Sequence, residues 1–321
     1  MPHRCAERKM EADIMKKNVL ALVLGSAMTV SMGMSAFAES TTEAATEAAP
    51  GVMKAAEGAT IEEIPTDFTT IQEGKLLVAT SPDFAPYEFY SIDDNGDPQL
   101  AGFDISLAQR IADDLGLELQ VVPMDFDGIL MELQNGNVDL GISGFSPEPE
   151  RAEIFDFSDL YYYGGQSFVI RAADKDKYTS YDDFKGLPVG AQTGSIQYTL
   201  AEENTPDANI TGLAKVTDII TELESGKLEG AFIETAVAES YIQNYPDLMI
   251  AWDVPYDSMG SAVALQKGSN LLPAVNAVIN NCLVDGSMDK YVAEANELAS
   301  GKVYEGQLDE NGEMMTEAST E

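Results

Sequence analysis

The residues best suited to do chemistry lie in one loop, residues 141–151, which follows a short apolar stretch. Ser143 and Ser146 supply hydroxyl groups, Gly144 lets a ligand approach the backbone N–H groups, and Arg151 supplies a guanidinium group. A guanidinium group binds a carboxylate through two parallel hydrogen bonds. The loop therefore predicts a carboxylate-binding site at the end of a strand, where open α/β sheets bind ligands. The alternative is a surface turn with a solvated arginine.

Several kinds of catalytic and metal site are excluded by the residues that are missing. The only histidine is His3, and the two cysteines are Cys5 and Cys282, so residues 39–321 keep one cysteine and no histidine. A Ser-His-Asp triad, a Cys-His pair, a histidine metal site and an internal disulfide are excluded there. We expect no metal and no cofactor, and we expect Cys282, on an apolar stripe, to be buried.

The chain is strongly acidic, with a formal net charge of −37 over 321 residues. Nucleic-acid backbones and anionic membranes would repel such a chain, so neither is an expected partner. The hydrophobic content of 45% is that of a globular protein. The length is enough for one large domain or two smaller ones.

Residues 1–38 have the pattern of a secretory signal peptide. Basic residues precede an apolar run, and Ala36-Phe37-Ala38 is a cleavage site of the A-x-A type. We expect cleavage near Ala38 and an extracytoplasmic (periplasmic) location. The alternative, a retained membrane anchor, is disfavoured because small and polar residues interrupt the run.

Two further segments are expected to be disordered. Residues 39–67 are rich in Glu, Thr and Ala and predict an acidic linker, and residues 306–321 predict an acidic tail.

Alternating strands and helices predict an α/β fold. Residues 75–80 read as a strand, 103–115 as an amphipathic helix, 117–121 as a strand and 126–133 as a helix. This order is typical of a parallel sheet covered by helices. A second α/β unit begins after residues 164–165.

The chain over residues 68–303 resembles the family 3 extracellular solute-binding proteins of amino-acid ABC transporters. Four motifs carry the resemblance in order. They are residues 78–89 ending in P-Y-E-F, the G-F-D-I of residues 102–105, residues 124–128, and residues 143–151. Weaker matches follow at residues 192–198 and 230–238.

The resemblance implies a periplasmic-binding-protein fold of type II, with two hinge-connected α/β lobes around a central cleft. The first lobe would comprise residues 68–165 and 257–305, and the second lobe residues 166–256. The hinge candidates are residues 164–165 and residues 255–258.

The resemblance also implies roles for the residues of the opening loop. Arg151 matches the arginine that holds the ligand's α-carboxylate, and Ser146 matches a hydroxyl partner of the ligand. Ser143 and Gly144 match positions whose backbone faces the ligand. Glu234 stands where the family usually has an aspartate that pairs with the α-ammonium group.

Four more positions match residues around the ligand's body. Phe84 and Phe126 match aromatic residues that enclose the ligand, although both could be plain core residues. Ser195 and Ile196 match a loop that donates backbone N–H groups to the carboxylate.

Two positions bear on specificity. Ser81 stands where binders of cationic side chains often carry an aspartate, and Gln192 could hydrogen-bond a polar side chain. These residues favour a neutral, polar amino acid as the ligand.

The resemblance implies a monomeric binding protein that captures a free amino acid by lobe closure and delivers it to a membrane permease. Two alternatives stay open: a catalytic relative of the fold, such as a dehydratase-like enzyme, and a soluble amino-acid sensor subunit. No pair of carboxylates is placed convincingly for acid–base catalysis, so we expect no enzyme activity.

Overall fold

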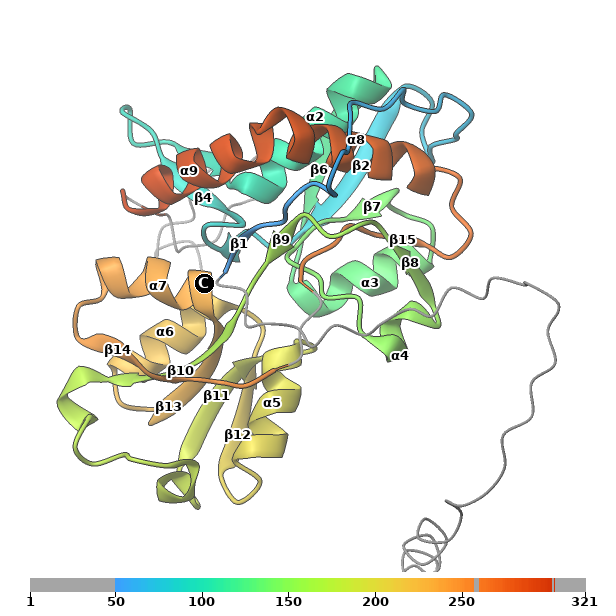
Figure 1. Cartoon of the computed structure of the whole chain (residues 1–321). Helices are drawn as coiled ribbons and strands as arrows, with labels where there is room; N and C mark the ends of the chain where they lie inside the picture. Colours follow the sequence, from blue (N-terminus) through green and yellow to red (C-terminus); the bar gives the residue numbers. More distant parts are fainter. Residues whose placement is uncertain (1–49, 257–259, 302, 304–321) are drawn as a thin grey trace, which may run out of the picture. The chain divides into compact units, whose positions relative to one another are not determined.

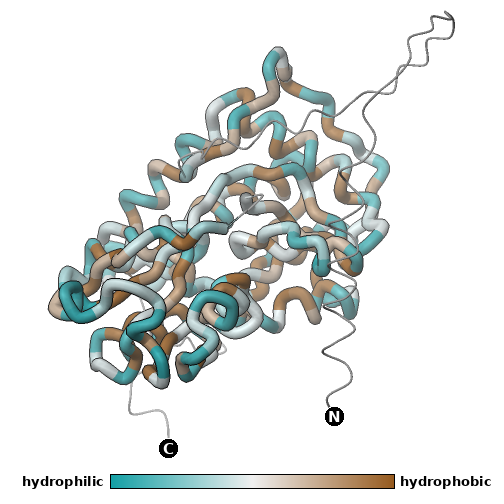
Figure 2. Tube along the Cα trace, turned by 60° about the horizontal axis from the view of Figure 1, so that its bottom comes forward, coloured by the Kyte–Doolittle hydropathy of each residue, from teal (hydrophilic) through white to brown (hydrophobic). Residues whose placement is uncertain are grey.

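The computed structural model of the chain describes residues 50–256, 260–301 and 303. The described part contains two five-stranded sheets, each packed against helices, so the predicted α/β class is confirmed (Figure 1). We call the part built on the sheet that contains β2 the first lobe, and the part built on the sheet that contains β11 the second lobe. Hydrophobic stretches follow the buried strands and helix faces, whereas hydrophilic stretches lie in the outer turns (Figure 2).

The sheet of the first lobe has the strand order β6-β2-β7-β15-β8. These strands are β6 (Glu118–Pro123), β2 (Lys75–Thr80), β7 (Leu140–Gly141), β15 (Ala264–Gln266) and β8 (Phe155–Phe157). β2 runs parallel to β6 and β7, but β15 runs antiparallel to β7 and β8. The sheet is therefore mixed rather than parallel, because β15 belongs to the chain that returns from the second lobe.

Helices accompany this sheet, and apolar positions explain why the longer ones form. They are α2 (Phe103–Leu115), α3 (Phe126–Gln134), α4 (Pro149–Ala152), α8 (Leu272–Asp285) and α9 (Ser287–Ala299). In α2 the spacing predicted a buried face, and Ala108 and Ile111 are fully buried. Gly116 ends α2 in the left-handed conformation, with φ of 69°. Cys282 is buried within α8, as expected.

A small antiparallel sheet joins the first lobe and carries the P-Y-E-F motif. Its strands are β3 (Asp83–Phe84), β4 (Glu88–Ile92) and β5 (Pro98–Ala101). Because β3 and β4 pair directly, Phe84 stands opposite Glu88. This pairing brings an aromatic ring and a carboxyl group to the same end of the sheet.

The sheet of the second lobe has the order β12-β11-β13-β10-β14. Its elements are β12 (Asn209–Leu213), β11 (Pro188–Gln192), β13 (Gly230–Glu234), β10 (Gln166–Arg171), β14 (Leu248–Asp253), α5 (Ile196–Asn204), α6 (Val216–Glu224), α7 (Thr235–Asn244) and two short 3₁₀ turns, Ala172–Asp174 and Tyr181–Phe184. Phe168 lies at the centre of its aromatic core and packs against Phe184, Phe232 and Trp252.

The chain enters the second lobe through β9 (Tyr162–Tyr163), just before the predicted hinge at residues 164–165. Tyr162 also pairs with Ser261 on the returning chain, so the outgoing and returning segments lie side by side. The other hinge candidate, residues 255–258, lies partly outside the described residues.

The predicted disordered linker over residues 39–67 is corrected for residues 50–67, which form an N-terminal strap along the first lobe. Strand β1 (Gly51–Val52) pairs with β9. Further along the strap, the backbone of Glu62 exchanges two hydrogen bonds with the side chain of Asn281. Val52 and Ile64 also pack against the core, and this apolar content outweighs the acidic composition. Residues 39–49, the signal segment and the tail lie outside the described residues.

Candidate ligand-binding site between the two lobes

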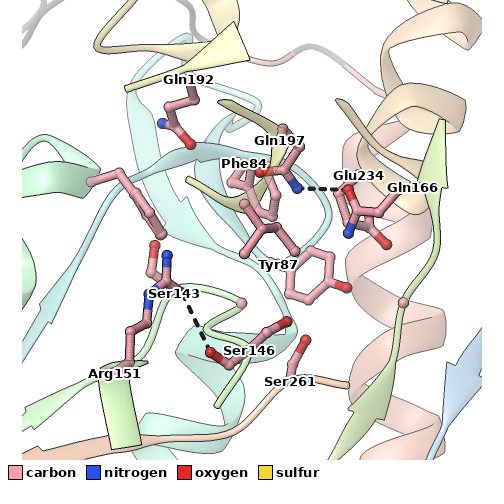
Figure 3. A pocket seen from close by; sticks show the side chains of 14 residues that line it. Phe84, Tyr87, Ser143, Ser146, Arg151, Gln166, Gln192, Gln197, Glu234 and Ser261 are labelled. Carbon is pink, nitrogen blue, oxygen red and sulfur yellow. Dashed lines mark hydrogen bonds between the residues drawn. The ribbon is translucent and has the colours of Figure 1, made fainter. Parts of the chain in front are cut away.

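Residues from both lobes line one pocket (Figure 3). The lining residues are Phe84, Tyr87, Phe126, Ser143, Gly144, Ser146, Arg151, Gly164, Gln166, Gln192, Ile196, Gln197, Glu234 and Ser261.

The first wall of the pocket is the loop that follows β7. Gly144 adopts φ of 58°, and its N–H group donates a 2.9 Å hydrogen bond to Asp104 Oδ2. A Cβ atom at Gly144 would lie 3.2 Å from the Phe84 ring and 3.4 Å from the Tyr87 ring. Conformation and space together therefore require glycine at this point.

Behind this wall lie two fully buried carboxyl groups, Glu88 and Asp104. Ser143 Oγ donates a short hydrogen bond to Glu88 Oε1. The two carboxyl groups interact with each other, and the Tyr161 hydroxyl group lies beside Asp104. Burial, followed by the charge of Asp104, raises the pKa of Glu88 well above its usual range, and burial raises the pKa of Asp104 to about 6. With the pKa of Asp104 at about 6 and that of Glu88 raised well above its usual range, the pair carries negative charge near neutral pH.

Arg151 lies on α4 with its guanidinium group at the pocket. Nη1 donates to the Ser146 carbonyl at 3.4 Å, and Nη2 donates across the cleft to the Gly194 carbonyl at 3.1 Å. Glu148 is its ion-pair partner, at 3.5 Å from Nε. Burial lowers the pKa of Arg151 and Glu148 opposes that shift, so the group stays a cation near neutral pH.

The second wall contains Glu234, which ends β13 and caps the N-terminus of α7. Its Oε2 accepts a 2.9 Å hydrogen bond from the Val237 N–H group, and its Oε1 accepts a 3.3 Å bond from Gly165. Burial raises the pKa of Glu234 to about 7, against the lowering effect of these bonds. A Cβ atom at Gly164 would lie 2.6 Å from Glu234 Oε1, so glycine leaves room for this carboxyl group.

Three glutamines complete the second wall. Gln197 Nε2 donates to Gln166 Oε1 at 2.8 Å, which ties α5 to β10 (Figure 3). Gln192 Nε2 donates to the Ala214 carbonyl at 3.1 Å and to Asp83 Oδ2 at 3.3 Å. Both amide protons of Gln192 are thus directed to acceptors outside the pocket.

Aromatic rings form the apolar part of the pocket. Phe84 and Tyr87 lie with their ring centroids 5.2 Å apart, and Phe126 stacks on Phe145 at 4.9 Å. Both predicted aromatic residues therefore line the pocket while also packing against a neighbouring ring.

Nine of the eleven residues predicted for the site line this pocket. The other two, Ser81 and Ser195, do not line the pocket but contact residues that do. Ser81 Oγ donates to Asp83, whereas Ser195 caps α5 by accepting from the Tyr198 N–H group. Direct contact of any of these residues with a ligand stays a prediction.

Five lining residues were not predicted for the site, namely Tyr87, Gly164, Gln166, Gln197 and Ser261. Tyr87 belongs to the P-Y-E-F motif and could have been found from it. Gln166 and Gln197 carry no local signal, because they reach the pocket only through the pairing of β10 and α5. Ser261 reaches it only because the returning chain pairs with β9.

The geometry suits a small zwitterion. A cation stands on the first wall and a carboxyl group on the second, with hydroxyl groups, amides and aromatic rings between them. Among the described residues, no group of three or more His, Cys, Asp or Glu side chains could hold a metal ion. In the same part of the chain, every helix is too short or too polar to cross a membrane.

The chain is similar to known binding proteins. It is 35% identical over 221 residues to the arginine-binding extracellular protein ArtP of Bacillus subtilis, covering 67% of this chain and 84% of that protein. A solved structure of the amino-acid ABC transporter substrate-binding protein AbpA from Streptococcus pneumoniae, bound to L-arginine, superposes with a TM-score of 0.69. The AbpA chain is 38% identical to this one, and the match covers 72% of this chain and 98% of the AbpA chain.

A third relative bears on the enzyme alternative. The ancestral amino-acid-binding protein AncCDT-1, described as a precursor of cyclohexadienyl dehydratase, is 32% identical with a TM-score of 0.62. The match covers 69% of this chain and 95% of the AncCDT-1 chain.

The family model of the bacterial extracellular solute-binding proteins, family 3, matches residues 76–295. The chain therefore belongs to family 3 of the bacterial extracellular solute-binding proteins.

Proposed function

We propose that this protein captures a free amino acid with a cationic side chain, L-arginine or L-lysine, and delivers it to the permease of an ABC transporter. The observation that carries the proposal is the buried Glu88–Asp104 pair directly behind Ser143. It adds negative charge to a pocket that already contains one cation and one carboxyl group.

The two ends of the amino acid have natural partners on opposite walls. Arg151 would bind the α-carboxylate, helped by the Ser146 hydroxyl group. Glu234 would bind the α-ammonium group, since its carboxylate has lone pairs left after its two backbone hydrogen bonds. Each lobe alone offers half of this site, so the ligand favours the closed arrangement.

The charges that remain select the side chain. Once Arg151 and Glu234 are paired with the ligand, the Glu88–Asp104 pair still carries negative charge, and no basic residue other than Arg151 lines the described pocket. A buried charge is costly unless it is paired. A guanidinium or ammonium group near Ser143 would pair with it.

This proposal differs from the neutral ligand that Ser81 suggested. The acidic group missing at position 81 would be replaced by Glu88, which lies behind Ser143. ArtP is named an arginine-binding protein, and the AbpA structure contains bound L-arginine. Both support a ligand with a cationic side chain. The neutral amino acid is the competing outcome in the test below.

The arrangement of the whole chain is part of the proposal. Residues 1–38 would be removed as a signal peptide near Ala38, which fits the extracellular family. The first lobe would comprise residues 68–165 and 257–305 and the second lobe residues 166–256, with the strap of residues 50–67 added to the first. We propose that the protein works as a monomer.

The test is a thermal unfolding panel on refolded, ligand-free protein with each of the twenty amino acids. We expect L-arginine and L-lysine to raise the melting temperature, because a ligand that binds only the folded state stabilises it. Stabilisation by neutral amino acids alone would contradict the cationic side chain. Stabilisation by none would contradict the amino-acid ligand, and turnover of a bound compound would favour the dehydratase-like alternative.

A further inference from the structure

Asp83, on β3 of the first lobe, receives hydrogen bonds from three elements of the second lobe. Its Oδ2 accepts a 2.5 Å bond from the Val216 N–H group and the 3.3 Å bond from Gln192 Nε2. Its backbone carbonyl accepts a 3.0 Å bond from the Tyr241 hydroxyl group. Asp83 is only 7% exposed and is not among the described residues that line the pocket.

The partner at Val216 is the first residue of α6. The first N–H groups of a helix have no partner within the helix, and the helix dipole makes its start favourable for an anion. The preceding residue, Lys215, supplies no side-chain cap but adds a favourable charge near Asp83. A carboxylate of one lobe therefore caps a helix of the other.

The same contact fixes the orientation of Gln192. Asp83 Oδ2 and the Ala214 carbonyl are both acceptors, so the Gln192 amide must turn its NH₂ group toward them. Its carbonyl oxygen is then directed to the pocket, as Figure 3 shows. The pocket gains an acceptor, which suits a ligand side chain that donates hydrogen bonds.

We propose that Asp83 is a closure latch. It ties the second lobe to the first without touching the ligand, and it positions Gln192 as an acceptor in the pocket. Separation of the lobes would return the Asp83 carboxylate and the Val216 N–H group to water, so these bonds stabilise only the closed arrangement. The inference rests on the proposed amino-acid binding by lobe closure.

The test compares wild type, Asp83→Ala and Asp83→Asn, with Asp94→Ala as the matched control. Asp94 is exposed in the turn between β4 and β5 and undergoes the same change of charge. Stopped-flow binding of L-arginine, or of the amino acid that stabilises the wild type most, gives both rate constants. Small-angle scattering without ligand gives the radius of gyration, and thermal unfolding gives the stability of the empty protein.

For Asp83→Ala we expect dissociation to be about tenfold faster, since closure is weakened, while association changes by less than about twofold. The radius of gyration should rise and the melting temperature of the empty protein should stay within about 2 °C. Asp83→Asn should recover most of the slow dissociation, because its amide oxygen still accepts from Val216. Asp94→Ala should match the wild type.

Unchanged dissociation together with an unchanged radius of gyration would overturn the latch. So would an equal loss of stability in the empty and bound protein, which would mark Asp83 as a fold residue, or Asp83→Asn dissociating as fast as Asp83→Ala. A wild type that no amino acid stabilises contradicts the proposed function instead. The latch is then judged by the scattering measurement, which needs no ligand.

Discussion

The two walls of the pocket are built in different ways. The first wall is a loop whose backbone rests on the buried Glu88 and Asp104, and its cation, Arg151, projects from a short helix. The second wall is made of helix starts, where Ser195 caps α5 and Glu234 caps α7. The cation of the first wall is therefore separate from the carboxyl groups that hold that wall in place, whereas on the second wall Glu234 has both roles.

This difference predicts how substitutions behave. A change on the first wall can remove binding while the lobe stays folded. A change at Glu234 mixes lost binding with a lost helix cap. Comparing affinity with stability across the two walls tests this distinction.

The largest effect is expected for Arg151→Ala. Removing one partner of a desolvated charge pair costs about 2–5 kcal/mol, which is at least thirtyfold in affinity. The melting temperature of the empty protein should change little, because the guanidinium group contacts mainly carbonyls and Glu148. Titration calorimetry and thermal unfolding measure the two quantities.

Arg110→Ala is the control for this prediction. Arg110 forms ion pairs with Asp114 and Asp285 on α2 and α8, at partly exposed positions away from the pocket. The Arg110→Ala variant should bind the amino acid with wild-type affinity. An Arg151→Ala variant whose Kd lies within threefold of the wild-type value would show that Arg151 does not bind the ligand.

The next largest effect is expected at Glu234, where two variants separate its role in binding from its role as a helix cap. Glu234→Gln keeps an oxygen for the Val237 N–H group but loses the charge, so affinity should fall about tenfold to a hundredfold with little loss of stability. Glu234→Ala should lose the same affinity and, in addition, about 1 kcal/mol of folding free energy through the lost cap. Exposed Glu239→Gln on α7 is the control. Equal stability of the Gln and Ala variants would argue against the capping role.

The pH dependence of binding should follow Glu234. Its pKa is about 7 in the empty pocket, and a bound ammonium group would lower it, so binding below pH 7 must release a proton. Affinity should therefore fall as the pH falls, by about tenfold between pH 8 and pH 6 from this group alone. Calorimetry across that range in wild type and Glu234→Gln measures it. A slope that persists unchanged in Glu234→Gln would assign the proton to another group.

Much of the fold was predictable because it depends on local patterns. The apolar spacing in residues 103–115 and the glycine at position 116 specify α2 and its end without reference to the rest of the chain. The loop with Ser143, Gly144 and Arg151 was predictable for the same reason, since its functional groups are adjacent in sequence.

The parts that sequence missed depend on contacts between distant segments. The antiparallel direction of β15 and the position of Ser261 follow from the chain's return out of the second lobe. The Glu88 carboxyl group behind Ser143 was missed for the same reason, because it comes into place through the turn between β3 and β4.

The smallest effect on binding is expected outside both walls, at the N-terminal strap. Asn281 on α8 is 4% exposed, accepts from the Glu62 N–H group at 2.7 Å and donates to the Glu62 carbonyl at 3.1 Å. Asn281→Ala should lower the free energy of unfolding by about 1–3 kcal/mol, because two hydrogen bonds are lost at a buried position. Affinity for the amino acid should stay within about twofold, since Asn281 lies on α8 and is not among the residues that line the pocket. Urea unfolding and calorimetry measure these quantities, and Asn296→Ala, at an exposed position of α9, is the control. If Asn281→Ala weakened binding as strongly as Glu234→Gln, the strap would take part in lobe closure. Binding and stability would then not depend on separate residues in the first lobe.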